Sequence, residues 1–341
     1  MRAGHGQACG RYRGRLVVIQ RNVAVTHRVL VAGASGYIGR HVVEALLHRN
    51  YRVVAQLRAG AQWSLTHPKL ECVYGELTES EQFLLDIEPC HFVISCLASR
   101  SGGVRDARLV EYDANSRLLA VALQWGVQRF LLLSAICVQK PRLVFQKEKL
   151  RFEAKLRESN LPWTIIRPTA FFKSLSGQIT RLQQGKPFFV FGSGTLTACK
   201  PIAEEDLATF IAEQLTSSSA IDAILPIGGP GPAITPLGQA QLLSQVLQQP
   251  VKTRSLPPRL FLIAAAVLSL FGLLFSRARD QAEFLRIAHF YATESMLVWS
   301  DEAGAYSEAL TPESGSKTLS ECYQEIIKGG VVSELGEHKL F

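Results

Sequence analysis

The segment Arg28-Val-Leu-Val-Ala-Gly-Ala-Ser-Gly-Tyr-Ile-Gly39 decides the fold of this chain. The four residues after Arg28, Val29 to Ala32, form an apolar run, as in a parallel strand that is covered on both faces. Three glycines then lead into a helical period of apolar residues. Gly33 would permit a tight turn, Gly36 would let the backbone approach a pyrophosphate, and Gly39 would let the helix pack closely on the strand. The segment therefore predicts a strand–turn–helix unit whose helix N-terminus holds the phosphates of a dinucleotide.

Strand and helix patterns alternate from this segment as far as Arg167. Further strands are expected at Arg52–Leu57, Glu71–Tyr74, His91–Ser95, Arg129–Ser134 and Trp163–Arg167, with the main helices at Asp106–Trp125 and Arg142–Ser159. This alternation predicts right-handed βαβ units and an α/β fold with a doubly wound, Rossmann-type parallel sheet. We expect the dinucleotide-binding domain at residues 28–168 and a smaller, less regular substrate-binding region at 169–341. In that region helices are expected at Ala203–Leu215 and near Pro236–Gln248, and a strand ending in a loop at Leu225–Pro232.

The composition is that of a folded globular protein. Of the 341 residues, 47% are hydrophobic and 19% charged, which excludes a disordered or low-complexity chain. Six arginines in residues 1–28 supply most of the net charge of +8, so the basicity does not indicate a nucleic-acid partner. Seven scattered cysteines without a C-x-x-C pair favour a reducing compartment and predict no metal site.

Residues 1–27 form a basic N-terminal extension. They are rich in Arg and free of acidic residues, which is typical of an organellar transit peptide, although Ser is absent. The alternatives are an unstructured extension and a start codon assigned too far upstream.

A second unusual segment, Leu260–Phe275, is apolar and lies between Arg259 and Arg277. Its 16 residues fall short of the roughly 20 that a helix needs to span a bilayer. The favoured interpretation is a buried or lid helix. The alternative is a helix that lies in a membrane surface with its arginines at the headgroups, which would give peripheral membrane contact through residues 260–275.

The end of the second strand indicates which dinucleotide is bound. An NAD enzyme places Asp or Glu there to hold the ribose 2′-hydroxyl, whereas Arg accommodates a 2′-phosphate. The sequence at this point is Gln56-Leu57-Arg58, with no acid nearby. NADPH is therefore the predicted cofactor, with Arg58, and secondarily Arg40, at the phosphate. The alternative is that Arg58 is an ordinary solvated loop residue.

In folds of this kind, a Tyr-x-x-x-Lys pair after the fifth strand performs carbonyl chemistry, and here the matching stretch is Phe145-Gln-Lys-Glu-Lys149. The i, i+4 spacing puts Phe145 and Lys149 on one helix face. Phenylalanine has no proton to give, so alcohol–ketone oxidoreduction is disfavoured, while Lys149 can still hold the nicotinamide ribose. Lys149 is thus the predicted catalytic residue. The residues expected to bind the cofactor are Gly33, Ser35, Gly36, Tyr37, Ile38, Gly39, Arg58, Glu76, Leu77, Cys96, Ala98, Ser134 and Lys149.

Several stretches go beyond this general cofactor pattern. They are Ser95-Cys-Leu-Ala-Ser99, Leu133-Ser-Ala-Ile-Cys-Val-Gln-Lys-Pro141, Arg167-Pro-Thr-Ala-Phe-Phe-Lys-Ser174, Ala198-Cys-Lys-Pro-Ile202, Leu225-Pro-Ile-Gly-Gly-Pro-Gly231 and Tyr291-Ala-Thr-Glu-Ser-Met296. With them, the chain from Arg28 onward resembles the divinyl chlorophyllide a 8-vinyl reductases, a family of atypical short-chain dehydrogenases/reductases of chlorophyll biosynthesis. That family also has Phe-Gln-x-x-Lys in place of Tyr-x-x-x-Lys. The basic extension and the strongly apolar Leu260–Phe275 are departures from it.

The resemblance implies NADPH-dependent reduction of the 8-vinyl group of divinyl chlorophyllide a, or of divinyl protochlorophyllide, to ethyl. A vinyl group conjugated to a tetrapyrrole can accept hydride at its terminal carbon, and the macrocycle delocalises the charge until a proton adds to the inner carbon. An aromatic wall of Phe145, Phe171 and Phe172 would suit this flat, apolar substrate, although each ring could equally be core packing. The proton donor stays open between water, Lys149 and Tyr112.

Two other functions fit the same residues. One is reduction of another alkene or of a benzylic ether on the same scaffold, and the other is a non-catalytic NADP-binding sensor or assembly protein. The resemblance implies a chlorophyllide-type tetrapyrrole as partner, and the charge distribution predicts no nucleic-acid partner. It places the protein in the cytoplasm of a photosynthetic prokaryote, or in a plastid if the extension is a transit peptide, with the thylakoid membrane as a candidate peripheral contact.

Overall fold

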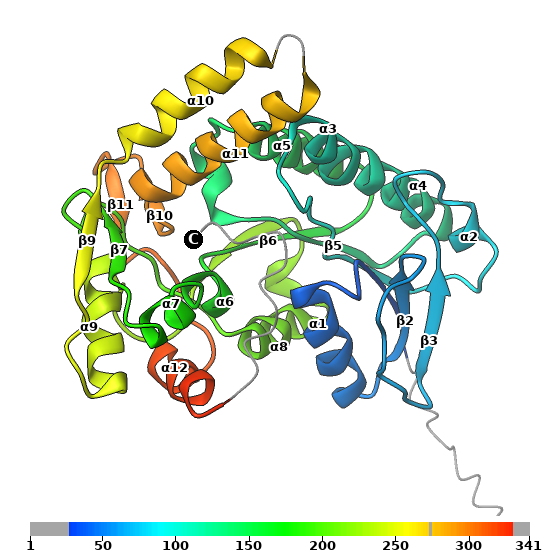
Figure 1. Ribbon diagram of the computed structural model, residues 1–341. Coiled ribbons are helices and arrows are strands. Elements are labelled where there is room, and N and C mark those ends of the chain that lie inside the picture. Colours follow the sequence, from blue (N-terminus) through cyan, green and yellow to red (C-terminus); the bar gives the residue numbers. More distant parts are fainter. Residues whose placement is uncertain (1–26, 273–274, 330–341) are drawn as a thin grey trace, which may run out of the picture.

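A seven-stranded parallel sheet runs through the centre of the molecule, in the strand order β3-β2-β1-β4-β5-β6-β8 (Figure 1). The computed structural model describes residues 27–272 and 275–329, so the interpretations of the N-terminal extension lie outside the described residues. The strands are β1 (Arg28–Ala32), β2 (Arg52–Leu57), β3 (Leu70–Tyr74), β4 (Phe92–Ser95), β5 (Arg129–Leu133), β6 (Trp163–Pro168) and β8 (Ala223–Ile227). From β1 the chain winds outward to β3 and then returns to β4 on the other side of β1. This confirms the predicted doubly wound sheet.

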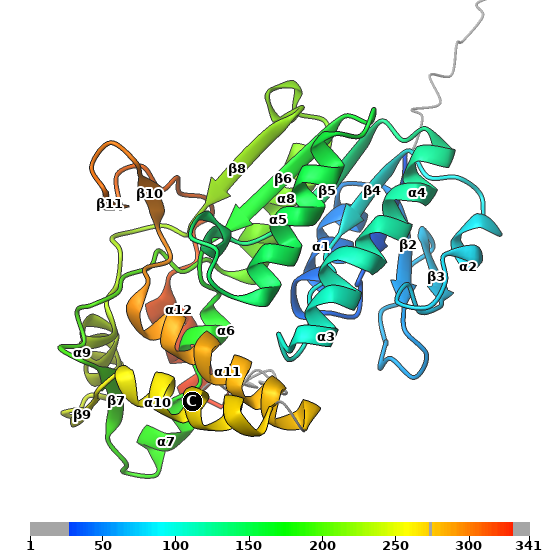
Figure 2. The same cartoon turned by 90° about the horizontal axis from the view of Figure 1, so that it is seen from above.

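Helices cover both faces of the sheet, as Figure 2 shows from above. One face carries α1 (Tyr37–His48) and α8 (Glu204–Gln214), and the other carries α4 (Asn115–Trp125) and α5 (Val144–Arg157). Alternate residues of a strand point to opposite faces, so Val29 packs with the α1 side and Leu30 with the α4 side. That is why β1 is apolar at every position after Arg28.

The predicted helix Asp106–Trp125 consists of three pieces. It begins as α3 (Val104–Ala107), continues as a π-helical segment η1 (Arg108–Ala114) and ends as α4. A π-helix places more residues in each turn than an α-helix and is frequent at functional sites. The smaller connecting helices are α2 (Gln82–Leu85), η2 (Ile136–Gln139) and η3 (Ser218–Ala220).

Two positions accept only glycine, one in the turn after β1 and one in the first turn of α1. Gly33 has φ of +75°, and a Cβ built there would lie 2.9 Å from the Cys96 carbonyl oxygen. A Cβ at Gly39 would lie 2.2 Å from the carbonyl oxygen of Gly33. The first turn of α1 therefore rests directly on the loop that follows β1, which is the packing expected for Gly39.

A smaller lobe lies beside the carboxyl ends of the strands. It contains α6 (Phe172–Leu175), α7 (Ile179–Gln183), α9 (Pro236–Leu247), α12 (Leu319–Ile327), the parallel pair β7 (Phe188–Phe191) and β9 (Thr253–Leu256), and the antiparallel pair β10 (Val298–Ser300) and β11 (Ala305–Ser307). Its own core includes Phe188, Leu243 and Tyr323. The large sheet extends past the expected boundary at residue 168, because β8 and α8, from the 169–341 region, complete its edge and one of its faces.

The apolar segment forms α10 (Arg259–Phe271), which packs on α11 (Ser276–Thr293) in a helical hairpin (Figure 1). Of the favoured interpretation, a buried or lid helix, the buried form is wrong, and the lid form stays a prediction. Ala265 is buried, whereas Leu260, Ile263 and Leu270 are 53%, 61% and 72% exposed. The reason is that α11 lies between α10 and most of the rest of the protein (Figure 1). One side of α10 therefore packs on α11, and its other side chains are exposed. Within the described parts of the chain, no helix combines the length and apolarity needed to cross a bilayer.

Candidate functional site

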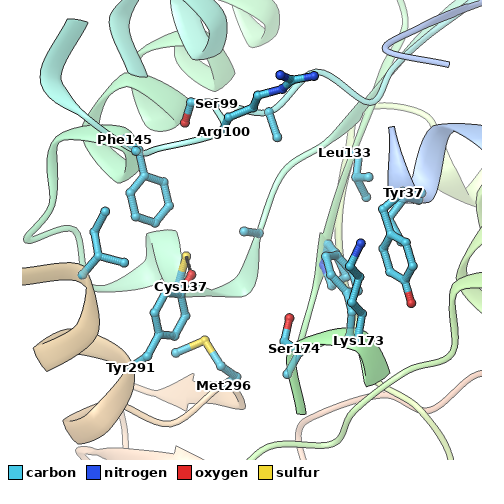
Figure 3. A pocket seen from close by; sticks show the side chains of 18 of the residues that line it. Tyr37, Ser99, Arg100, Leu133, Cys137, Phe145, Lys173, Ser174, Tyr291 and Met296 are labelled. Carbon is cyan, nitrogen blue, oxygen red and sulfur yellow. Dashed lines mark hydrogen bonds between the residues drawn. The ribbon is translucent and has the colours of Figure 1, made fainter. Parts of the chain in front are cut away.

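One large cavity, of about 1000 Å³, lies between the carboxyl ends of the strands and the smaller lobe. It opens beside the turns that follow β1 and β4, where the winding of the sheet reverses and where open α/β sheets bind their ligands. Figure 3 shows a close view of its side chains. The structure brings together on its wall most of the residues predicted from the sequence: Gly33, Ser35, Gly36, Tyr37, Ile38, Arg58, Glu76, Leu77, Cys96, Ala98, Ser134, Phe145, Lys149 and Phe171.

Two predicted site residues do not line the cavity. Gly39 lies behind the glycine turn and serves packing. Phe172 is 1% exposed and belongs to the core of the smaller lobe, so the expectation that it forms part of the substrate wall is wrong. The chain turns into α6 between Phe171 and Phe172, so the two rings point to different sides.

The side chain of Gln56 holds the glycine turn. In the sequence this residue indicated only that the acid of an NAD site is missing. The Gly33 N–H donates to Gln56 Oε1 at 3.0 Å, and Gln56 Nε2 donates to the carbonyl oxygen of Gly75 at 2.7 Å. Gln56 is 2% exposed and lines the cavity. Its side chain thus ties the turn after β1 to the turn after β3. A lone polar residue inside the otherwise apolar β2 was the available signal.

The two candidate arginines differ in their surroundings. Arg58 follows β2, is exposed and lines the cavity, and among the described residues its guanidinium has no hydrogen-bond or ion-pair partner. Arg40 instead donates to the carbonyl oxygen of Gln62 at 3.3 Å and lies 5.8 Å from the centre of the Trp63 ring. Arg40 does not line the cavity, so of these two arginines Arg58 is the one that can meet a ligand there.

Lys149 is held by a buried carboxylate. Its Nζ lies 2.7 Å from Glu111 Oε2, and the two side chains are 10% and 2% exposed. The other carboxylate oxygen of Glu111 accepts hydrogen bonds from the Ser99 N–H at 2.9 Å and the Ser99 hydroxyl at 2.8 Å. Glu111 comes from the π-helical segment η1, so this segment connects Lys149 to the loop after β4. Glu111 could not be predicted as a site residue from the sequence, because nothing in its spacing from Lys149 signals the contact.

A second buried acid, Glu153, accepts a hydrogen bond from the Ser134 hydroxyl. The Ser134 hydroxyl donates to Glu153 Oε1 at 2.5 Å, and Glu153 also pairs with Arg167. Ser134 therefore lines the cavity with its hydroxyl already directed at a protein carboxylate.

The wall opposite the glycine turn is largely aromatic. Phe145 lies on this wall, whereas Phe171 lies at the other end, with its ring centre 6.4 Å from that of Tyr37. Further lining residues, not predicted from the sequence, are Phe188, Phe189, Phe191, Phe284, Tyr291 and Met296. Figure 3 shows Phe145, Tyr291 and Met296 grouped at one end of the cavity, and Tyr37 and Lys173 at the other. The cavity therefore has a polar end near the glycine turn and an aromatic end near α11.

Burial shifts the titration of groups on this wall. Burial, with a smaller contribution from Glu204, raises the pKa of Tyr37 above its usual range. Burial lowers the pKa of Lys173, whose Nζ lies 4.6 Å from the centre of the Tyr37 ring. Burial also raises the pKa of the Cys96 and Cys199 thiols to about 12, so both are neutral near pH 7.

Tyr112, one of the three candidate proton donors, lies outside the cavity wall. Its ring is covered by the guanidinium groups of Arg151 and Arg108, at 3.9 and 4.8 Å from the ring centre. The structure therefore separates Tyr112 from Lys149, which does reach the cavity.

Comparison with known proteins identifies the family. A model of an NAD(P)H-binding family matches residues 33–218. The chain is 42% identical over 331 residues to a chloroplastic divinyl chlorophyllide a 8-vinyl-reductase of Oryza sativa subsp. indica, covering 92% of this chain and 82% of that one. The chain belongs to the divinyl chlorophyllide a 8-vinyl-reductase family. The Arabidopsis thaliana member of this family is 41% identical over 329 residues, covering 91% and 79% of the two chains.

Solved structures support the fold of this 8-vinyl-reductase family member. The complex of leucoanthocyanidin reductase and NADPH from Vitis vinifera has a TM-score of 0.62 at 18% identity, covering 88% of this chain and 99% of that one. At this identity the likeness concerns the arrangement of the elements alone.

The buried pair of Glu111 and Lys149 gives a stability prediction. Glu111→Leu removes the partner of a buried ammonium group, and we expect it to lower the free energy of unfolding by about 3–5 kcal/mol. Removing both charges with Glu111→Leu and Lys149→Met should recover most of that loss. Urea denaturation of the single and double variants measures both effects.

The exposed pair of Arg49 and Glu213, 2.7 Å apart, provides the control. Glu213→Leu should cost at most about 1 kcal/mol, since surface ion pairs contribute little. A Glu111→Leu protein as stable as the Glu213→Leu protein would contradict the prediction.

Proposed function

We propose that this protein reduces the 8-vinyl group of divinyl chlorophyllide a to an ethyl group with NADPH. One observation carries the proposal: a glycine turn suited to a dinucleotide and a long aromatic wall face each other across one cavity of about 1000 Å³. A cavity of this size is at the upper end of the range for ligand sites, which suits a cofactor together with a large flat substrate. Membership of the reductase family selects this substrate from the flat apolar molecules that would fit.

The residues at the polar end fit the cofactor. Gly36 lines the cavity without a side chain to fill it, and α1 begins directly after it, so free backbone N–H groups are available for phosphate oxygens. We assign the pyrophosphate to the turn of Gly33, Ser35, Gly36, Tyr37 and Ile38, and the rest of the cofactor to Glu76, Leu77, Cys96, Ala98 and Ser134. When bound, NADPH supplies the hydride that the terminal vinyl carbon accepts.

The protein's own groups orient the two reactants. We assign Lys149 to the nicotinamide ribose, with its ammonium group positioned by the ion pair with Glu111. Phe145 and Phe171 present apolar surface to the macrocycle. Phe145 has no hydroxyl to polarise a carbonyl, and reduction of a conjugated vinyl group needs none there, because the macrocycle takes up the charge.

A direct assay tests the function. Purified protein incubated with NADPH and divinyl chlorophyllide a should convert the pigment to its monovinyl form. Pigment chromatography measures the loss of the divinyl peak and the gain of the monovinyl peak. Tight NADPH binding without loss of the divinyl peak would overturn the proposal and favour a cofactor-binding assembly protein. Oxidation of NADPH with a benzylic ether but not with the pigment would favour the other reductase class.

Arg58 is proposed to bind the 2′-phosphate of NADPH. Arg58→Ala should weaken NADPH binding by about 10- to 150-fold, the equivalent of a lost charge-assisted contact, and leave NADH binding nearly unchanged. Arg40→Ala is the matched control and should change neither affinity, because Arg40 is engaged by Gln62 and Trp63 outside the cavity. Titration of cofactor fluorescence measures the affinities of wild type and both variants for the two cofactors. An equal loss for both cofactors in Arg58→Ala would show that Arg58 does not recognise the phosphate.

We also propose that α10 contacts a membrane surface peripherally. Its outer face exposes large apolar side chains, including Ile263 and Leu270, which a purely aqueous surface rarely presents as one patch. Exposed arginines flank the helix at Arg259, Arg277 and Arg279. Apolar side chains on one helix face with basic residues at its ends fit an anionic lipid surface, into which the helix would sink without crossing it.

Vesicle flotation tests this contact. The full chain should float with phosphatidylglycerol vesicles, and less with phosphatidylcholine vesicles, since the arginines favour anionic headgroups. Ile263→Glu combined with Leu270→Glu should abolish flotation. Leu123→Glu combined with Leu310→Glu changes two exposed leucines elsewhere and should not. Equal flotation of both double variants would refute the role of α10.

A further inference from the structure

Tyr291 brings a phenol into the aromatic end of the cavity. It belongs to α11, lines the cavity and packs against the cluster that contains Phe145, Cys137 and Met296. Figure 3 shows its hydroxyl beside the Cys137 thiol, on the side where the Phe145 ring lies. The phenol that is missing at position 145 is therefore supplied to the same chamber from a different helix.

The hydroxyl of Tyr291 is poorly satisfied by the protein. Its acceptor in the described part of the chain is Cys137 Sγ at 3.9 Å, and a thiol sulfur is a weak acceptor. Two tyrosines of the smaller lobe, by contrast, have strong partners: Tyr306 donates to Glu294 Oε2 at 2.6 Å, and Tyr323 donates to the Leu175 carbonyl oxygen at 3.1 Å. Buried tyrosine hydroxyls usually have such a partner. The weakly bonded hydroxyl of Tyr291, which faces the cavity, therefore indicates a group that interacts with a ligand.

We propose that Tyr291 delivers the proton that completes reduction of the vinyl group. This inference rests on the proposed function. Hydride adds to the terminal vinyl carbon, the electron pair of the C=C bond passes into the macrocycle, and the inner carbon then takes the proton from the Tyr291 hydroxyl. The O–H bond breaks, the new C–H bond forms, and the phenolate left behind regains a proton from water when the ethyl product leaves.

The surroundings of Tyr291 suit a proton donor better than a base. Burial is the main cause that raises the pKa of Tyr291 well above 10, and the facing Cys137 thiol and Glu111 carboxylate act in the same direction. The phenol therefore stays protonated near neutral pH and is available when charge reaches the inner carbon. Lys149, the other candidate within the cavity, is already engaged by Glu111.

Tyr291→Phe is the first test, with Tyr112→Phe as the matched control. In single turnover, Tyr291→Phe should slow vinyl reduction by roughly 10²–10⁴-fold, the usual contribution of a positioned general acid. Pigment binding without NADPH and NADPH binding without pigment should each stay within about threefold of wild type, since only a proton-transfer step is lost. Tyr112→Phe should match wild type in all three measurements.

The outcomes separate the two proposals. If wild type leaves the pigment unreduced, the proposed function fails. If wild type turns over and Tyr291→Phe is as fast, or loses pigment binding instead of rate, the assignment of Tyr291 alone fails.

A second variant covers the case in which Tyr291→Phe does not fold. Replacing Tyr291 by 2,3,5-trifluorotyrosine keeps the hydroxyl and makes the phenol much more acidic. Since the donor works only when protonated, the single-turnover rate of this variant should fall as pH rises through the lowered pKa. Wild type should show no such fall in that pH range. Identical pH profiles would overturn the assignment.

Discussion

The closeness of three backbone segments at the end of β1 is the constraint on which the rest of this structure depends. A side chain at Gly39 would meet the Gly33 carbonyl oxygen at 2.2 Å, and one at Gly33 would meet the Cys96 carbonyl oxygen at 2.9 Å. Because these positions are glycines without a side chain, the start of α1 and the turns after β1 and β4 can lie in direct contact. Gln56 then ties the same turn to the one after β3. The polar end of the cavity is the space that these converging turns leave.

Much of the large sheet could be predicted from the sequence, because its signals are local. Arg52–Leu57 is a strand with the predicted bounds, and the other predicted strands of the sheet differ by one residue or two at an end. Short apolar runs that lie between turns and helices can be recognised without knowing what packs against them. The glycine turn likewise carried enough information to place Gly33, Ser35 and Gly36 at the cavity.

The remaining site residues depend on contacts between distant segments. Glu111 pairs with Lys149, which lies 38 positions away in the sequence, and Tyr291 contributes to the aromatic end of the cavity, beside Phe145, from the C-terminal region. Neither position has a periodicity that marks it as part of a site. Phe172 was placed wrongly for a related reason, since two adjacent phenylalanines give no sign of which one turns inward. The exposure of α10 followed from the position of α11, which the apolar run itself cannot reveal.

The π-helical segment η1 makes the length of the chain before α4 a determinant of the site. Because each of its turns holds more residues than an α-helical turn, the faces presented by α3 and α4 are offset from those of one continuous α-helix. Shortening this stretch by one residue could be absorbed by a return to α-helical geometry, with the sheet packing of Leu118 preserved. The carboxylate of Glu111 would then rotate away from Lys149 and Ser99. Insertions and deletions in this stretch are therefore constrained by the ammonium group on α5 as well as by the core.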